Sequence, residues 1–189
     1  GSTNSMALLV PSGDYAREKA LLTDLAELEH VESVTGLSNV EIKDGYVLTD
    51  QLTPRQMSEL MDIDYSLVTL LYASYAADQE SYGQIVSGLE DYSVPLIDMF
   101  FYLYDMKETG YLSLDGDLSK TLDDLYAQLT DAKAQLSSDD YSRIVLNLDL
   151  PEESQETFDY LQVLHQTAEQ EYDTVYIMGK LTLKTIKHR

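Results

Sequence analysis

The residues with the clearest spacing for metal chemistry lie at positions 115–126. Asp115, Asp117 and Ser119 follow the alternating pattern with which a calcium-binding loop begins. The sixth position of such a loop, normally glycine, is Lys120, and the twelfth, normally glutamate, is Tyr126. We therefore interpret these acids as a helix cap, with a calcium site as the alternative.

The remaining reactive side chains form no recognisable constellation. His30, His165 and His188 each lack a second histidine three or four positions away, which argues against a zinc site. The 34 acidic residues offer many carboxylate pairs, but no spacing singles one out, and such pairs are typical of a solvated face. The chain has no cysteine, no nucleophile elbow and no phosphate-binding glycine loop. We expect no catalytic activity, no metal and no cofactor.

The charge balance narrows the choice of partners. Twelve basic and 34 acidic residues leave a net charge of −22 over 189 residues. This sign argues against nucleic-acid binding and against docking on anionic lipid through a basic patch. No apolar run reaches the ~18 residues of a membrane span, and the first residues are too polar for a signal peptide. We expect the chain as given to be soluble.

One segment is apolar enough to be buried in a core or to bind a hydrophobic ligand. Within residues 96–106, Asp98 and Asp105 are the only polar positions. A helix that is apolar on every side is either buried or presented to an apolar ligand. The first reading makes this segment the core of the middle region. The second makes it a hydrophobic ligand site, because methionine and aromatic side chains adapt well to such ligands. Its candidate residues are Met99, Phe100, Phe101, Tyr102 and Tyr104.

Residues 140–179 have the pattern of a strand, a helix and a second strand. Ile144, Leu146, Leu148 and Leu150 point one way and Arg143, Asn147 and Asp149 the other, as in a strand with one wet face. Pro151 ends that strand, and Glu152 and Glu153 place negative charge where a helix N-terminus favours it. The helix has one apolar stripe, and residues 175–178 form the second strand. The stripe consists of Phe158, Leu161, Leu164 and Ala168.

Residues 7–36 repeat this pattern. An apolar strand at 7–10 precedes a turn at 11–14 that supplies a helix cap, and residues 31–36 are extended again. The helical stripe consists of Leu21, Leu22, Leu25 and Leu28. Two strand–helix–strand halves predict an α+β fold, namely a ferredoxin-like split βαβ sheet with four main strands and two helices on one face. Two unrelated βαβ pieces in a larger α/β sheet are the alternative.

The middle third reads as an all-helical insertion. Before it, Lys43, Asp44 and Gly45 predict a turn between two short extended pieces at 40–42 and 46–48. Thr53, Pro54 and Gln56 form the start signal of a helix, and a leucine seam from 118 to 136 predicts the last one. The predicted organisation is a first βαβ half at residues 1–50, a helical insertion at 51–138, a second half at 139–179 and a tail of cloning origin at 180–189.

Segments 2–37 and 140–179 resemble the extracytoplasmic porter domain of MMPL-type resistance-nodulation-division (RND) transporters of Gram-positive bacteria. In the first, a strand ends in Val10-Pro11, an acid caps the helix, and a second strand ends in Val34-Thr35-Gly36. In the second, Pro151-Glu152 opens the helix and the last strand ends at Gly179, where the family's chain re-enters the membrane. The basic tail at 180–189 departs from the family pattern.

The resemblance implies an extracytoplasmic domain of a cell-membrane transporter that exports hydrophobic or lipid-like substrates. Its partners would be the transmembrane bundle and the second porter domain of the parent protein, which could be a homo-oligomer, together with a hydrophobic or amphiphilic substrate. The main rival is an acidic surface module that recognises a protein partner through its helical insertion. An enzyme that uses a carboxylate pair and a calcium-dependent assembly module are further rivals.

Overall fold

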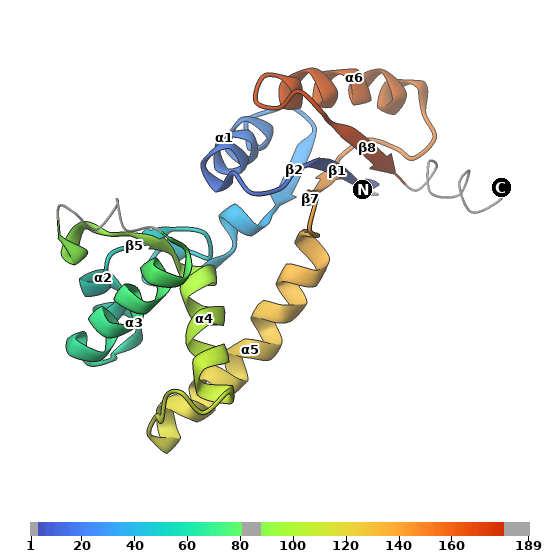
Figure 1. Ribbon diagram of the computed structural model, residues 1–189. Coiled ribbons are helices and arrows are strands. Elements are labelled where there is room, and N and C mark those ends of the chain that lie inside the picture. The colour runs from blue at the N-terminus through green and yellow to red at the C-terminus, as the bar shows by residue number, and fades with distance from the viewer. Residues whose placement is uncertain (1–3, 81–87, 180–189) are drawn as a thin grey trace. The chain divides into compact units, whose positions relative to one another are not determined.

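The computed structural model describes residues 4–80 and 88–179 and has a mixed α+β fold (Figure 1). The chain divides into two compact units. The first combines Gly1–Val40 with Ala132–Arg189, and the second is Glu41–Asp131. The predicted tail at 180–189 lies outside the described residues. No described helix combines the length and apolar character that crossing a membrane requires.

The first unit is built on a four-stranded antiparallel sheet with the order β2-β7-β1-β8. The central pair joins the two ends of the sequence, since Asn4 lies opposite Leu148 and Pro11 opposite Tyr141. The elements of this unit are β1 (Asn4–Pro11), α1 (Tyr15–Ala26), β2 (Val31–Thr35), the 3-10 turn η1 (Leu37–Asn39), β7 (Tyr141–Leu148), α6 (Gln155–Glu169) and β8 (Tyr176–Gly179).

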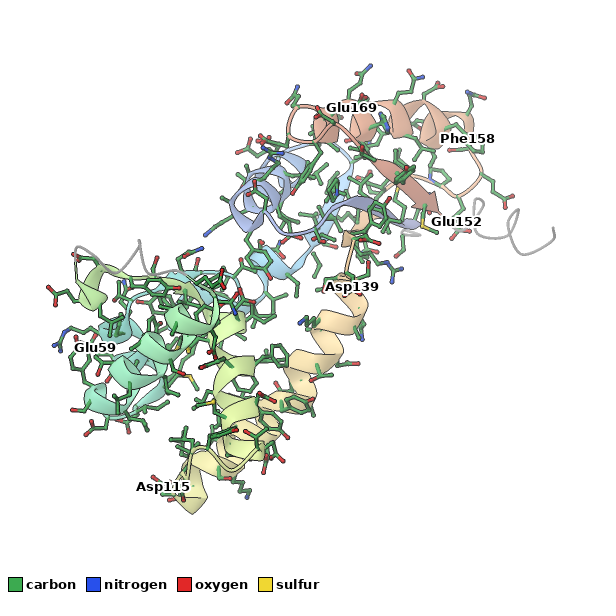
Figure 2. The ribbon with its side chains drawn as sticks, in the orientation of Figure 1. Glu59, Asp115, Asp139, Glu152, Phe158 and Glu169 are labelled. Atoms are coloured by element: carbon green, nitrogen blue, oxygen red, sulfur yellow. The ribbon has the colours of Figure 1, made fainter. Side chains whose placement is uncertain are left out.

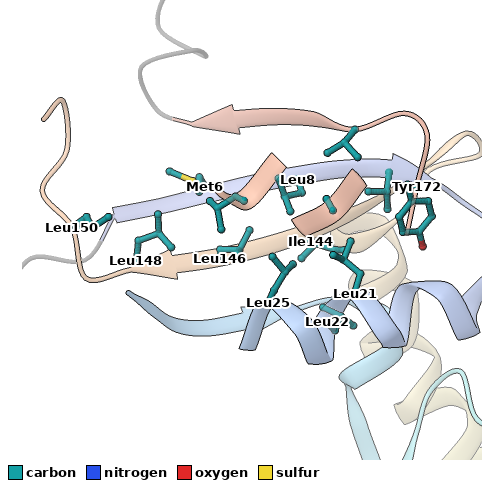
Figure 3. Packing of buried hydrophobic residues seen from close by; sticks show 14 residues of the cluster. Met6, Leu8, Leu21, Leu22, Leu25, Ile144, Leu146, Leu148, Leu150 and Tyr172 are labelled. Atoms are coloured by element: carbon teal, nitrogen blue, oxygen red, sulfur yellow. The ribbon is translucent and has the colours of Figure 1, made fainter. Parts of the chain in front are cut away.

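One face of this sheet carries the core of the first unit (Figure 3). The alternation predicted for residues 144–150 is confirmed, because Ile144, Leu146 and Leu148 are fully buried. Leucines of α1 pack on these strand residues, and α6 contributes Leu164 and Ala168 to the same cluster. Both helices therefore cover the same face of the sheet.

The start of α6 differs from the prediction. Glu152 and Glu153 do not open the helix, because Glu153 has a φ of 57° and lies in a turn. Ser154 caps α6 instead, and its hydroxyl accepts a 3.1 Å hydrogen bond from the amide of Thr157. Phe158 was predicted on the inner stripe but is 42% exposed. The cap of α1 is as predicted, since the Asp14 carboxylate accepts from the amide of Arg17 at 2.9 Å.

The second unit is mainly helical but is not all-helical. Two short antiparallel pairs, β3 with β4 and β5 with β6, lie within it. Asp44 and Gly45 both have positive φ and connect β3 to β4, as the predicted turn requires. The elements are β3 (Glu41–Lys43), β4 (Tyr46–Val47), β5 (Gln51–Leu52), α2 (Pro54–Met61), α3 (Tyr65–Asp78), the 3-10 turn η3 (Leu89–Asp91), β6 (Val94–Pro95), α4 (Leu96–Glu108) and α5 (Gly116–Leu136, which continues into the first unit).

The predicted capping box of α2 is present. The Thr53 hydroxyl accepts from the amide of Gln56 at 3.3 Å, and the Gln56 side chain accepts from the amide of Thr53 at 2.9 Å. Thr53→Ala should lower the free energy of unfolding by about 1 kcal/mol, because the first turn of α2 loses this acceptor. Urea denaturation followed by circular dichroism measures the change. Thr121→Ala, on the exposed surface of α5, is the matched control and should be neutral within about 0.5 kcal/mol. Equal losses in the two variants would contradict the prediction.

Candidate functional site

The five predicted ligand-binding residues lie on different sides of α4. Met99 and Phe100 are buried in the core of the second unit. They line an apolar cavity of only about 10 Å³, together with residues of α2 and α3 such as Met57 and Leu71. That volume is near the minimum for a single water molecule, so an amphiphile could enter only if the helices moved apart.

Tyr102 connects α4 to α3 through polar contacts. Its hydroxyl donates to Asp78 Oδ2 at 2.9 Å and lies 2.5 Å from the hydroxyl of Ser74. The Tyr102 ring meets the ring of Tyr75 edge-to-face at 5.3 Å. Burial is the main cause that raises the pKa of Tyr102. This side of α4 is therefore closed by α3.

Phe101 and Tyr104 face α5. The Tyr104 ring stacks on Tyr126 with 3.9 Å between centroids, and Phe101 approaches Tyr126 edge-to-face at 6.0 Å. Lys107 lies 5.0 Å above the Tyr104 ring, and its Nζ is 2.6 Å from Asp123 Oδ1. Helix α4 thus contacts neighbours on several sides, which explains why its sequence is apolar nearly all round.

Asp115, the first acid of the calcium-like pattern, caps α5. The Asp115 carboxylate accepts from the amide of Leu118 at 2.8 Å, which agrees with the helix-cap interpretation. No group of three or more histidine, aspartate or glutamate side chains within metal-binding reach occurs in residues 4–80 and 88–179.

A buried carboxylate in the first unit was not predicted. Glu18 in α1 is 1% exposed. Its Oε2 accepts from the backbone amide of Ser38 at 3.0 Å and also from the Ser38 hydroxyl. Within the described residues, neither Oε1 of Glu18 nor the buried hydroxyl of Tyr172 has a hydrogen-bond partner. Burial is the main cause that raises the pKa of Tyr172, and the charge of Glu18 is the next. The spacing contained a signal, because Glu18 precedes Leu22 by four residues and Leu25 by seven and so continues the buried stripe.

A cleft beside α6 was also not predicted. Its volume is about 460 Å³, and it lies between α6 and β8. Its apolar part consists of Leu161, Val175 and Ile177, its polar part consists of Gln162, Gln166 and Glu169, and Tyr176 also lines it. His165 lies between them, with Nδ1 2.6 Å from Glu169 Oε1 and Nε2 3.2 Å from the carbonyl oxygen of Val175. This cleft is much larger than the cavity beside Met99. Sequence periodicity could not reveal it, because it depends on which strand lies at the sheet edge.

His30 directly precedes β2 and contacts the residue that follows β7 and a residue of α6. It has a φ of 70°, its Nδ1 lies 2.7 Å from Asp149 Oδ1, and its carbonyl accepts from the Asp149 amide at 2.9 Å. The Tyr160 ring of α6 packs edge-on at 5.4 Å, and its hydroxyl donates to the carbonyl of Glu29. The hydrogen bond to Asp149 raises the pKa of His30 most, and the charges of Glu29 and Glu156 add to it while burial opposes it.

Asp149→Asn should therefore lower the pKa of His30 towards ~6.5, the value of an isolated imidazole. A titration of the imidazole proton resonances by NMR measures this change. Because the folded-state pKa is raised, the contribution of His30 to stability is complete below ~6.5 and is lost as the pH rises through the folded-state value. Glu169→Gln, beside His165, is the control and should leave the His30 titration unchanged. An unchanged His30 pKa in Asp149→Asn would contradict the assignment of its cause.

Comparison of the chain with protein-family models, with curated proteins and with solved structures finds no match.

Proposed function

We propose that the chain is a porter-like extracytoplasmic domain of an RND/MMPL-type membrane transporter that exports hydrophobic or lipid-like substrates. The observation that carries this proposal is the arrangement of the sheet, in which the two ends of the sequence form one structure. In a ferredoxin-like split βαβ fold, the four main strands lie in the order 4-1-3-2 with both helices on one face. The order β8-β1-β7-β2 and the shared face of α1 and α6 support that arrangement.

The division of the chain into two units supports the part of the proposal that concerns substrate contact. A mainly helical unit, Glu41–Asp131, is inserted in the sequence between the two halves of the sheet. We assign substrate contact to this unit, through Met99, Phe100, Phe101, Tyr102 and Tyr104, which a substrate reaches only when α4 separates from the helices packed against it. The domain has no catalytic step of its own and acts with the transmembrane bundle and the second porter domain of its parent.

The sequence of the gene around this segment tests the assignment to a transporter. Apolar stretches of ~20 residues on both sides are the expected result, because a porter domain is anchored in the membrane at each end. A reading frame that lacks such stretches would overturn the proposal. The substrate assignment has its own test, in which lysophosphatidylcholine is titrated while tyrosine fluorescence and the melting temperature are recorded. No change in either signal would exclude an independent lipid site in this domain.

Two exposed apolar side chains favour the alternative, an acidic module that binds a protein partner through the helical unit. Leu70 of α3 is 68% exposed and Tyr111, just after α4, is 79% exposed. Tyrosine is among the residue types enriched in protein interfaces. Under this alternative, flanking membrane segments would be absent and a Leu70→Asp/Tyr111→Asp double variant would lose its partner.

A further inference from the structure

The outer strand of the first sheet has one edge that no described strand occupies. β8 is the terminal strand of the order β2-β7-β1-β8, and its described neighbour is β1. In residues 4–80 and 88–179, no strand pairs with its other edge. Backbone amides and carbonyls along such an edge can accept a further strand.

The side chains of β8 place the cleft directly beside this edge. Ile177 lies opposite Leu8, which is fully buried in the core, so Ile177 points to the face that α6 covers. Tyr176 and Met178 point to the opposite face, because successive residues of a strand alternate. A strand added to β8 would alternate in the same way. Every second side chain of that strand would enter the cleft between Leu161 of α6 and Ile177 of β8.

An apolar stripe on α6 extends beyond the cleft. Phe158 precedes Leu161 by three residues and Gln162 by four, so it lies on the same face of the helix. Its side chain is 42% exposed. Figure 2 shows Phe158 near one end of α6 and Glu169 near the other. An extended ligand could therefore contact two apolar side chains of α6, Phe158 and Leu161, beside the polar residues of the cleft.

Acidic residues predominate in and around α6, as they do in the chain as a whole. Residues 151–179 contain no lysine and no arginine. The acids in this range are Glu152, Glu153, Glu156, Asp159, Glu169, Glu171 and Asp173. At a net charge of −22, a second copy of the chain would be repelled, whereas a cationic segment would be attracted.

We propose that α6 and β8 form a docking groove for an extended cationic peptide of a partner protein. The peptide pairs its backbone with the outer edge of β8 and inserts alternate apolar side chains against Leu161 and Ile177. The intervening lysine or arginine residues point to the opposite face of the sheet, and the net charge of −22 of the whole chain attracts them. This interaction is separate from the proposed transport function, and neither depends on the other.

Binding of a synthetic peptide to the full chain tests the groove. The probe is a fluorescein-labelled, acetylated (Lys-Val)₄ amide, and fluorescence anisotropy at low salt measures its dissociation constant. We expect saturable binding that weakens as salt is added. A (Glu-Val)₄ peptide should not bind. The (Lys-Val)₄ peptide with N-methylated alternate amides should bind at least tenfold more weakly, because it cannot pair with a strand. Equal binding of the methylated peptide would show charge attraction alone and overturn the proposal.

Two matched variants locate the binding site. Leu161→Glu places a charge in the cleft and should weaken binding at least tenfold. Val163→Glu, which lies on the same helix but outside the cleft, should change binding less than twofold. Amide NMR shifts of β8 in the unaltered chain should respond to the peptide, which keeps the test valid if Leu161→Glu does not fold. The proposal would be overturned if these shifts were absent or if both variants changed binding equally. It would also be overturned if sedimentation analysis showed a dimer of the chain formed through β8.

Discussion

Leu146→Ala should lower the free energy of unfolding by about 3 kcal/mol, within the 2–5 kcal/mol typical of such core truncations. Leu146 lies in β7 between two strand neighbours, opposite Met6 of β1 and Val34 of β2. Its side chain is fully buried beneath the helices that cover the sheet. The substitution removes apolar contacts and leaves a cavity, and the central strand cannot move inward without disturbing both pairings. Urea denaturation followed by circular dichroism measures the loss.

Leu70→Ala is the matched control for this prediction. The chemical change is the same, but Leu70 is 68% exposed on α3, where alanine also has the better helix propensity. We expect a change within about 0.5 kcal/mol. Similar losses in the two variants would mean that the buried face of the sheet is not the main core of the first unit.

Glu18→Ala should be about as destabilising, by roughly 3 kcal/mol, for a different reason. The carboxylate is the acceptor for both the amide and the hydroxyl of Ser38, which is itself fully buried. Without Glu18 both donors lose their partner, and each unsatisfied buried group costs about 1–3 kcal/mol. The substitution should loosen η1 where it packs on α1. The loss should appear in urea denaturation and as faster amide exchange at Ser38.

Two further variants separate the hydrogen bonds from the packing of the side chain. Glu18→Gln keeps an oxygen that can accept from Ser38 and removes a buried charge, so its loss should be clearly smaller than that of Glu18→Ala. In a Ser38→Ala background one of the two donors is already absent. Glu18→Ala should then cost less than in the unaltered chain. Equal costs in both backgrounds would show that Glu18 stabilises the fold through packing alone.

Local patterns of the sequence predicted many of the elements and their ends. The alternation around Leu146, the capping box of Thr53 and Gln56, and the turn at Asp44-Gly45 all depend on residues within a few positions of one another. Each of these patterns has one favoured local conformation, so each prediction was confirmed. The helix start at Glu152 was wrong because two local signals competed. Negative charge favoured an earlier start, but the hydroxyl of Ser154 provided the cap.

The sequence alone also determined that this chain is strongly acidic, lacks thiol chemistry and contains two strand–helix–strand patterns separated by a mainly helical region. The tertiary structure decided that both patterns share one sheet, that β8 lies at its edge beside the cleft, and that Glu18 is buried against Ser38. These features depend on contacts between residues far apart in the chain. A residue's own type and its near neighbours do not specify which distant surface will cover it.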